Sequence, residues 1–324
     1  MSEMPRHGLI ASLIAGVFLQ LAAPPSLALD TVRLGKAVPS SFALGAAEVG
    51  TEAGIFAQQG LDISIASFRG EAQLQQALAA GSLDIGLGSG AGLGFRVKGS
   101  PTIGVAALYG APANMVLVVP AKSPVRSVTD LRGKRIAVTT KGSLTDWLVR
   151  ELSRQQGWGA EAIAIYPLGQ IPAQVAAMGR GEVDGIVLGA VSGYELEAAG
   201  RARNLIQFGD VVKRFYTHVI FATDEMVDKR QDLLRRFLRG WFKTVAFMKQ
   251  NRAFTVKSEQ RTLGVRQSVV EKIYDAEMPG FSIDGAWDPE VIDVIRASLK
   301  ELDILPKIPD AKALYTDAFV PVRF

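Results

Sequence analysis

The chain has 324 residues, which exceeds one typical domain and suits two domains of about 100–150 residues each. Hydrophobic residues make up 48% and charged residues 21% of the chain, which is enough to bury a core and excludes a disordered polypeptide. The formal net charge of +4 is small for this length and gives no reason to expect nucleic-acid binding. The chain has no cysteine, so it forms no disulfide and carries no lipid on an N-terminal cysteine.

The first 28 residues have the pattern of a secretory signal peptide. Arg6 precedes an apolar run over residues 9–23, two prolines follow it, and Ser26 and Ala28 are small residues at the positions that a signal peptidase reads. The run is too short and too interrupted for a membrane span of about 20 apolar residues. We expect cleavage near Ala28 and, in a Gram-negative source, free diffusion in the periplasm; an uncleaved anchor is the alternative.

After residue 29, strand patterns alternate with helix patterns. We expect strands at 31–36, 61–68, 83–87 and 103–109, helices at 42–59 and 71–80, and a loop at 88–94. Gly60 and Gly81 follow the two helices, at the position where left-handed backbone commonly ends a helix. This alternation predicts a mostly parallel sheet with helices on both faces.

A second unit repeats the first at an offset of 100 residues. Residues 77–85 match 177–185, and each copy has a helix end, a capping glycine and an aspartate, Asp84 or Asp184, that opens a strand. Upstream, 31–36 corresponds to 135–140 and 61–66 to 162–167. Three elements in the same order predict two similar α/β lobes. The equivalent positions of the two aspartates indicate one structural role rather than a catalytic carboxylate pair.

The last hundred residues have the pattern of a helical tail. Helices are predicted at 229–251, 267–277 and 289–302, with one strand pattern at 219–223. Because these strands are too few for a third lobe, we expect the tail to return to the first. Lobe 1 is then 29–112 plus 217–324, lobe 2 is 113–216, and crossings near 110–114 and 213–217 form a hinge for closure.

The first tail helix predicts a buried stripe and a basic face. Apolar residues follow helical spacing at Leu234, Leu238, Trp241 and Val245, with basic residues between them at Arg235, Arg236, Arg239 and Lys243. We interpret the basic side as a solvated surface, and docking to a permease or a membrane as the alternative.

Four stretches carry a family resemblance. Residues 53–62, 77–86, 127–138 and 177–184 resemble motifs of the substrate-binding proteins of bacterial ABC transporters, of the nitrate/sulfonate/taurine type. The resemblance implies a type II periplasmic-binding fold, an α/β architecture of two lobes joined by a double-crossover hinge, with a permease and its ATPase as partners. Residues 187–194 lack the aromatic-acid-proline turn of many relatives, so we expect a smaller, less polar pocket wall there, with room for a bulkier or aromatic ligand.

The candidate ligand contacts come from the loops after strands, because open α/β sheets bind ligands beyond the carboxyl ends of their strands. Helix N-termini in these loops favour an anion such as a sulfonate, nitrate or carboxylate. The candidates are Ser40, Ser41, Phe42, Arg69, Gly70, Ser89 and Gly90 in lobe 1, Lys141, Gly142, Ser143, Thr145, Gln170, Gly189 and Ala190 in lobe 2, and His218 near the second crossing.

Each candidate also has a structural interpretation. Residues 141–145 combine a cation, a glycine and two hydroxyls at a helix start, and ordinary N-capping uses the same residues. Residues 40–42 also fit a plain strand–helix turn, the glycines fit close packing, and Arg69 fits an ion pair with Glu71. His218 also fits a buried structural role, and core packing competes with ligand stacking for Tyr109, Tyr194 and Tyr216.

Enzymatic and cofactor motifs find little support. Residues 86–91 read G-x-G-x-x-A, but residues 105–115 contain no acidic residue to hold a dinucleotide ribose. His218 is the one histidine after residue 28, which leaves no zinc site and no Cys/His pair. We expect a monomeric, non-enzymatic solute-binding protein without a metal or cofactor. The alternatives are an enzyme like those that synthesise the thiamin pyrimidine, whose Cys-rich motif is absent, and a ligand-sensing domain, although no DNA-binding segment follows.

Overall fold

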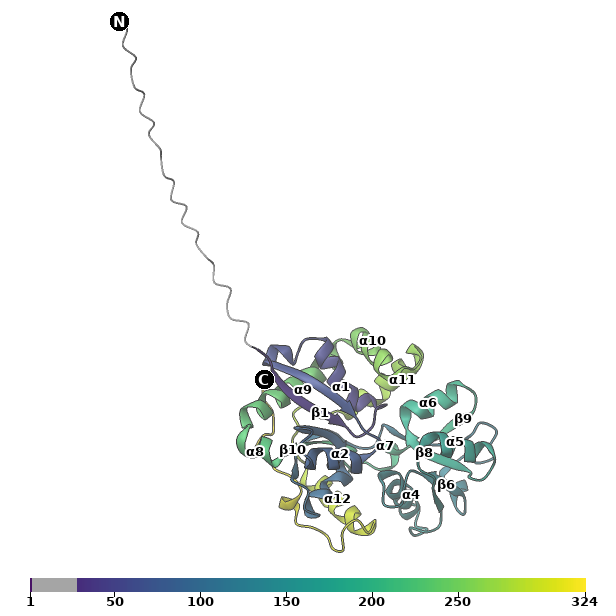
Figure 1. Cartoon of the computed structure of the whole chain (residues 1–324). Coiled ribbons are helices and arrows are strands. Elements are labelled where there is room, and N and C mark those ends of the chain that lie inside the picture. Colours follow the sequence, from purple (N-terminus) through teal and green to yellow (C-terminus); the bar gives the residue numbers. More distant parts are fainter. Residues whose placement is uncertain (2–27) are drawn as a thin grey trace.

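The computed structural model describes Met1 and residues 28–324, which form two α/β lobes side by side (Figure 1). The predicted signal peptide at 1–28 lies outside the described residues apart from its two ends. Across the described part, no helix has the length and apolar character needed to cross a membrane.

The first lobe is built on a five-stranded sheet in the order β2-β1-β3-β10-β4. Its strands are β1 (Asp30–Lys36), β2 (Leu61–Ser67), β3 (Ile85–Ser89), β4 (Thr102–Tyr109) and β10 (His218–Thr223). β1 is parallel to β2 and β3, whereas β10 is antiparallel to both β3 and β4. β10 is the returning strand predicted at 219–223, because it enters the first sheet after the chain has built the second.

The second lobe repeats this arrangement in the order β7-β6-β8-β5-β9. Its strands are β5 (Met115–Pro120), β6 (Arg135–Val138), β7 (Ala164–Pro167), β8 (Gly185–Gly189) and β9 (Ala202–Gln207). β5 is antiparallel to both neighbours, as β10 is in the first sheet. The predicted fold class, two α/β lobes, is therefore confirmed, and the sheet predicted as mostly parallel is in each lobe a mixed sheet with one strand antiparallel to both neighbours.

Helices cover both sheets, and the tail adds a helical layer to the first lobe (Figure 1). In the two sheet units the helices are α1 (Phe42–Glu52), α2 (Glu71–Ala79), α3 (Gly94–Val97), α4 (Leu144–Gln155), α5 (Ile171–Gly179), α6 (Ala190–Ala198) and α7 (Phe208–Val211). The tail helices are α8 (Asp224–Lys229), α9 (Gln231–Gln250), α10 (Arg252–Leu263), α11 (Gln267–Glu277) and α12 (Pro289–Glu301). α9 and α10 pack on α1, and α11 reaches α6 of the other lobe.

Short 3₁₀ segments complete the chain, and two of them correct the sequence prediction. They are η1 (Ala57–Gln59), η2 (Gly90–Leu93), η3 (Val128–Leu131), η4 (Met278–Gly280) and η5 (Ala311–Ala313). The helix predicted at 42–59 is wrong, because α1 ends at Glu52, Gly54 has a φ of 68° and the chain turns before η1. The loop predicted at 88–94 is also wrong, because β3 continues to Ser89 and η2 follows at once.

The helix α10 was not predicted, and its composition explains why. Thr255, Ser258 and Glu259 are polar residues on its buried side, so the apolar spacing that indicates an amphipathic helix is missing. In α9, by contrast, Leu234 and Trp241 of the predicted stripe are fully buried, and Arg236 of the basic side pairs with Asp232 and Asp30 at the surface.

Candidate functional site

Each lobe contains the same arginine–aspartate joint, away from the carboxyl ends of the strands. The main-chain N and the guanidinium of Arg33 donate to the Asp84 carboxylate at 2.8–3.1 Å. Arg135 donates to Asp184 in the same way at 2.9–3.1 Å. These bonds connect the first strand of each unit to the chain that enters the third, so both aspartates have the structural role predicted from the repeat.

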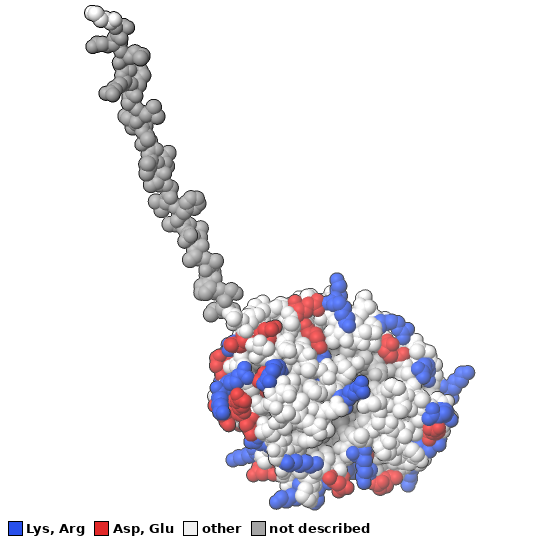
Figure 2. Space-filling view, in the orientation of Figure 1, with Lys and Arg blue, Asp and Glu red and all other residues white. Residues whose placement is uncertain are grey.

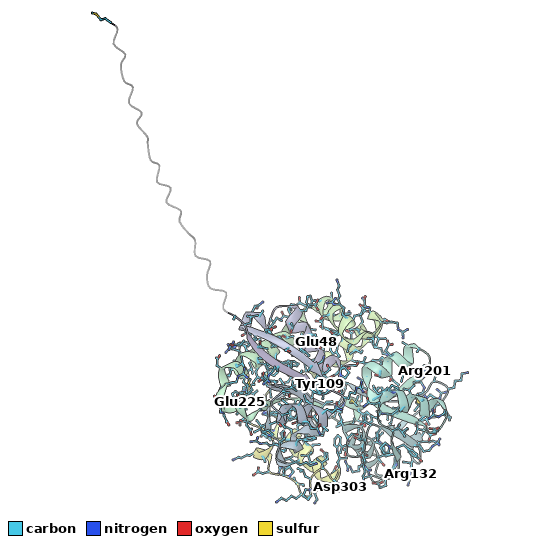
Figure 3. The ribbon with its side chains drawn as sticks, in the orientation of Figure 1. Glu48, Tyr109, Arg132, Arg201, Glu225 and Asp303 are labelled. Atoms are coloured by element: carbon cyan, nitrogen blue, oxygen red, sulfur yellow. The ribbon has the colours of Figure 1, made fainter. Side chains whose placement is uncertain are left out.

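The carboxyl ends of the first sheet meet the crossings between the lobes. His218, at the start of β10, pairs in register with Ser89 at the end of β3 and with Tyr109 at the end of β4. Figure 3 shows Tyr109 near the middle of the molecule, and Figure 2 shows a largely uncharged surface, hollowed where the lobes meet. The predicted residues Ser89 and His218 therefore lie together at the junction.

The second sheet reaches the same junction through Asn114. The main-chain oxygen of Asn114 accepts a hydrogen bond from Ala190 N at 2.8 Å, and Met115 pairs with Gly189. Asn114 Nδ2 lies 2.8 Å from His218 Nε2, which ties the two crossings together. The structure thus brings four predicted residues from both lobes, Ser89, Gly189, Ala190 and His218, to one place.

The N-terminus of α4, where Lys141, Gly142, Ser143 and Thr145 were predicted as ligand contacts, uses its polar groups for its own capping. Ser143 Oγ accepts from Asp146 N at 3.3 Å, and Asp146 Oδ2 accepts from Gly142 N at 2.7 Å. Thr145 Oγ1 accepts from Thr139 N at 3.0 Å. Since the buried Asp146 carboxylate already balances the helix dipole, this end offers an anion less than the sequence indicated. Lys141 is exposed, and its contact with a ligand stays a prediction.

The N-terminus of α2 is also occupied by a carboxylate from its own first turn. Glu71 accepts from Ser89 N at 2.7 Å and from Gln75 Nε2 at 2.9 Å, and burial raises the pKa of Glu71. Arg69 is exposed and makes no ion pair with Glu71 in the described part of the chain, so that alternative does not hold. Gly70 has a φ of 126°, a conformation that glycine adopts at little cost.

Three other helices, each following a strand, have uncapped N-termini. α1, α5 and α6 have no acidic residue in the first turn and no side-chain hydrogen bond at the cap. Their cap residues are the predicted candidates Ser41, Gln170 and Gly189. Ser41 is 9% exposed, whereas the Phe42 ring next to it is fully buried against Tyr274 and Phe281. Helix starts without a neutralising carboxylate suit an anion, although Ala190 N of α6 already donates to Asn114 O.

Some buried polar atoms at the junction have no hydrogen-bond partner. They include Asn114 Oδ1 and Glu277 Oε2. Burial lowers the pKa of His218 to about 4 and raises the pKa of Glu277 to about 8. Sequence reasoning missed Asn114 and Glu277. Glu277 follows Val270 by seven residues in α11, so helical spacing on the buried side was the available signal.

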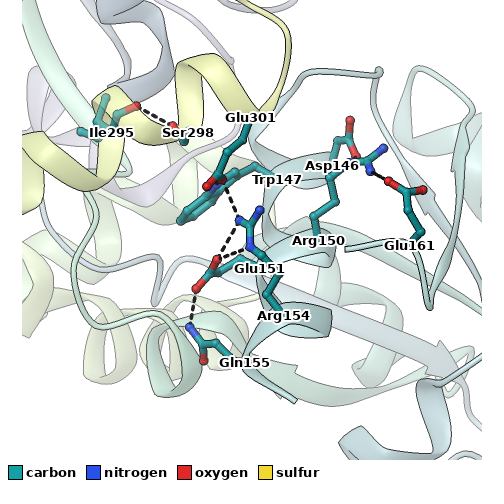
Figure 4. Close-up of polar contacts among 10 residues, drawn as sticks. All are labelled: Asp146, Trp147, Arg150, Glu151, Arg154, Gln155, Glu161, Ile295, Ser298 and Glu301. Atoms are coloured by element: carbon teal, nitrogen blue, oxygen red, sulfur yellow. Dashed lines mark hydrogen bonds and ion pairs between the residues drawn. The ribbon is translucent and has the colours of Figure 1, made fainter. Parts of the chain in front are cut away.

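The lobes contact each other through two pairs of helices. On α12, Glu301 pairs with Arg154 of α4 at 2.8 Å and accepts from Trp147 Nε1 at 3.3 Å (Figure 4). On α11, Lys272 pairs with Glu197 of α6 at 2.6 Å. The two contacts lie at opposite ends of the junction in Figure 1.

Within the described part of the chain, the predicted contacts line neither the surface depression beside α9 nor a metal site. A surface depression of about 300 Å³ lies beside α9 and is lined by Ile55, Lys243, Phe247 and Phe324, among others, but by none of the predicted contacts. Among the residues that the structure describes, no group of three or more His, Cys, Asp or Glu side chains is placed to hold a metal ion.

The chain belongs to the NMT1/THI5-like family, because a model of that family matches residues 46–253. Solved structures add agreement in fold. The chain is 22% identical to the alkanesulfonate-binding protein SsuA of Xanthomonas axonopodis pv. citri, with a TM-score of 0.71, covering 87% of this chain and 95% of that one. The periplasmic aliphatic sulphonate-binding protein SsuA of Escherichia coli gives 21% identity, a TM-score of 0.73 and coverage of 89% and 92%.

An enzyme shares the same fold. The desulfurization enzyme DszB is 15% identical, with a TM-score of 0.64 and coverage of 90% and 97%. No curated protein sequence matches the chain. The resemblance predicted from the motifs, to substrate-binding proteins of the nitrate/sulfonate type, is confirmed by the family match and these structures.

Proposed function

We propose that this chain is the solute-binding component of an ABC importer, and that it captures a small anion between its lobes for delivery to a permease and its ATPase. The observation that carries the proposal is the set of three uncapped helix N-termini, of α1, α5 and α6, which come from both lobes. No carboxylate of its own first turn neutralises the positive end of any of the three, although Ala190 N of α6 already donates to Asn114 O and Pro172 of α5 has no N–H. The likeness in fold to two sulfonate-binding proteins supports the same function.

The ligand contacts follow from this arrangement. Ser41, Gln170, Gly189 and Ala190 stand at the uncapped helix starts, and Ser89 and His218 line the junction beside them. The group at 141–145 is a secondary candidate, since Asp146 occupies the end of α4.

The proposal includes export and a non-enzymatic role. The predicted signal peptide supports a periplasmic protein, and we propose that a monomer captures the solute when lobe 1 (29–112 plus 217–324) closes on lobe 2 (113–216). A single histidine after residue 28, without any cysteine, supports binding rather than catalysis. Chemical turnover of a bound ligand would overturn this part of the proposal and favour an enzyme with the fold of DszB.

A thermal-shift screen tests the proposed ligand class. Sulfonates, nitrate, aromatic acids and pyrimidines are added to the purified protein, and the melting temperature is measured. A ligand that binds only the folded state stabilises it by RT ln(1 + [L]/Kd), or about 2.7 kcal/mol at a hundredfold excess over Kd. Stabilisation by neutral or cationic compounds alone contradicts anion capture.

A pair of variants locates the site. Ser41→Asp keeps a good N-cap residue at α1 but adds a negative charge where we place the anion, so affinity should fall by about tenfold or more while stability is kept. Ser143→Asp makes the same change at α4, where Asp146 is already present, and serves as the control. Equal losses of affinity in both variants would mean that the start of α4 belongs to the primary binding site.

A further inference from the structure

The outer side of α9 carries a row of basic side chains without acidic partners. Arg235, Arg239 and Lys243 follow one another at intervals of four residues, so they lie on the same side of the helix. Arg235 and Arg239 are exposed, and Lys243 is half-buried. None of the three forms an ion pair with another described residue, although the Arg235 guanidinium lies over the Phe319 ring at 4.8 Å. The row therefore presents positive charge that the fold itself leaves uncompensated.

Apolar side chains continue this row and lie beside it. Phe247, the next residue at the same spacing, is half-buried and lines the depression of about 300 Å³ together with Lys243, Ile55 and Phe324. Phe324 is 59% exposed, although burial is the usual state of such a ring. Exposed apolar side chains next to a row of cations are typical of proteins that bind at a membrane interface.

The chain enters the fold beside the same helix. Arg236, on the neighbouring side of α9, pairs with Asp30 at 2.5 Å and with Asp232 at 2.8 Å, so these two carboxylates do not compensate the basic row. Leu29, which precedes Asp30, is 44% exposed. Figure 1 shows the start of β1 and the C-terminus together, on the side of the first lobe that faces away from the second. Because the predicted signal peptide ends at Ala28, this side lies next to the membrane until the peptide is cleaved.

We propose that the α9 face, defined by Arg235, Arg239, Lys243, Phe247 and Phe324, docks the protein on a membrane surface that contains anionic phospholipids. The three cations lie against lipid phosphates, and Phe324 enters the layer between headgroups and acyl chains. The inference goes beyond the proposed function, because this face lies outside the lobe junction and its binding needs no solute.

A lipid surface fits this face better than an acidic protein partner does. The cations are spread along about 12 Å of helix and do not converge on one point, so they suit an extended surface of mobile phosphates. The apolar side of α9, with Leu234, Leu238 and Trp241, is buried in the core. The helix therefore stays in the fold and binds through its outer side alone.

Vesicle co-sedimentation tests the inference. The protein purified after export is mixed with vesicles of phosphatidylcholine alone, or of phosphatidylcholine with an equal part of phosphatidylglycerol. It should bind the anionic vesicles in preference to the neutral ones, and added salt should weaken binding because it screens the charges. The combined variant Arg235→Gln, Arg239→Gln and Lys243→Gln should lower binding to anionic vesicles by about tenfold or more. Phe324→Ser should lower it by a smaller factor, since it removes apolar contact and no charge.

A matched variant separates the α9 face from net charge. Lys122→Gln, Arg132→Gln and Arg201→Gln together remove the same charge from exposed residues of the second lobe that form no ion pair with a described residue. Figure 3 labels Arg132 and Arg201 on that lobe. This variant should bind anionic vesicles as the wild type does, and unchanged melting temperatures show that both triple variants fold.

Three results overturn the inference: no binding to anionic vesicles, equal binding to neutral ones, or equal losses in the two triple variants. A dimer in sedimentation velocity that only the α9 variant breaks also overturns it, because that result assigns the face to a second copy of the chain. Each of these outcomes leaves solute capture standing, since the thermal-shift screen measures it without vesicles.

Discussion

The two lobes have one sheet order and one arginine–aspartate joint, but they bury that joint differently. The Asp84 side chain of the first lobe is 5% exposed, whereas that of Asp184 in the second is 29% exposed. Arg230, at the end of α8, gives Asp84 a second partner at 2.8 Å. The difference comes from the tail, because Arg230, which follows α8, reaches Asp84 of the first lobe and Asp184 has no such second partner among the described residues.

The same difference appears in the titration of the carboxyl groups. In the described residues, the carboxyl groups whose pKa is raised are Glu71, Glu259 and Glu277, all in the first lobe or the tail helices that cover it. In the second lobe, the pKa of Glu182 is lowered by hydrogen bonding to Arg180, and the pKa of Asp184 by hydrogen bonding to Arg135. The repeat therefore gives both lobes the same scaffold, whereas the tail helices bury acidic side chains on one side of the junction.

The largest expected effect is a fall in stability as the pH rises. Burial raises the pKa of Glu277 from the usual 4.5 to about 8, so between these values the unfolded chain has lost a proton that the folded chain keeps. The free energy of unfolding should fall over this range by at most about 5 kcal/mol. Urea unfolding at pH 5 and pH 8 measures this fall.

Glu277→Gln should remove that part of the pH dependence. Asp184 in the second lobe should act in the opposite direction. Its lowered pKa contributes stability above about pH 3.8, and this stability is lost as the pH falls below that value. Asp184→Asn should remove this loss of stability at low pH. An unchanged slope in Glu277→Gln would mean that this carboxyl group is not the buried acid responsible.

The joints themselves should differ in strength. Burial by itself raises the pKa of Asp84, and the hydrogen bonds from Arg33 outweigh it, so the pKa of Asp84 is lowered. Asp84→Asn should destabilise the protein by about 3 kcal/mol, because it leaves two arginines facing a buried neutral side chain. Asp184→Asn should cost only about 1 kcal/mol, since solvent screens that pair. If urea unfolding at neutral pH gave equal losses of stability in the two variants, the tail would not strengthen the joint at Asp84.

Packing of the tail on α1 gives the next prediction. A Cβ at Gly45 would overlap the Glu259 carboxylate of α10, whereas a Cβ at Gly179, at the end of α5, would have no neighbour within 4 Å. Gly45→Ala should lower the free energy of unfolding by about 2 kcal/mol through overpacking. Gly179→Ala should be neutral or slightly stabilising. A neutral Gly45→Ala would show that α10 is free to move away from α1.

The smallest effect concerns the contact between the lobes at α4 and α12. Glu301→Gln removes the ion pair with Arg154, while Glu151→Gln removes a second pair of the same arginine at 2.8 Å within α4. Each should cost less than about 1 kcal/mol of stability, because both pairs are partly exposed. Only Glu301→Gln should shift the ligand-free protein toward an open form, seen as a larger radius of gyration in small-angle X-ray scattering. An equal radius of gyration in both variants would mean that the contact between Glu301 and Arg154 does not hold the lobes closed.

Local patterns in the sequence were sufficient for the repeated scaffold. The strands other than β5 and β9, the glycines after α2 and α5, and the aspartates before β3 and β8 were predicted from residues a few positions apart, because backbone conformation and the alternation of buried side chains have short periods. The return of β10 also followed, since the tail had one strand pattern and no third sheet to join. Helix α10 and the end of α1 were not predicted. The buried side of α10 is polar, and α1 ends just before a single left-handed glycine, so neither feature appears as a periodic pattern of apolar residues.

The candidate site depended on tertiary structure for its most specific features. The sequence placed hydroxyls and glycines at helix starts, but only the folded chain shows that Asp146 closes the start of α4 while those of α1, α5 and α6 stay open. Glu277 ends a correctly predicted helix, yet its burial beside Tyr109 joins residues 168 positions apart. Such contacts are decided by how the tail packs across the junction, because the desolvation of a side chain depends on neighbours that local sequence does not specify.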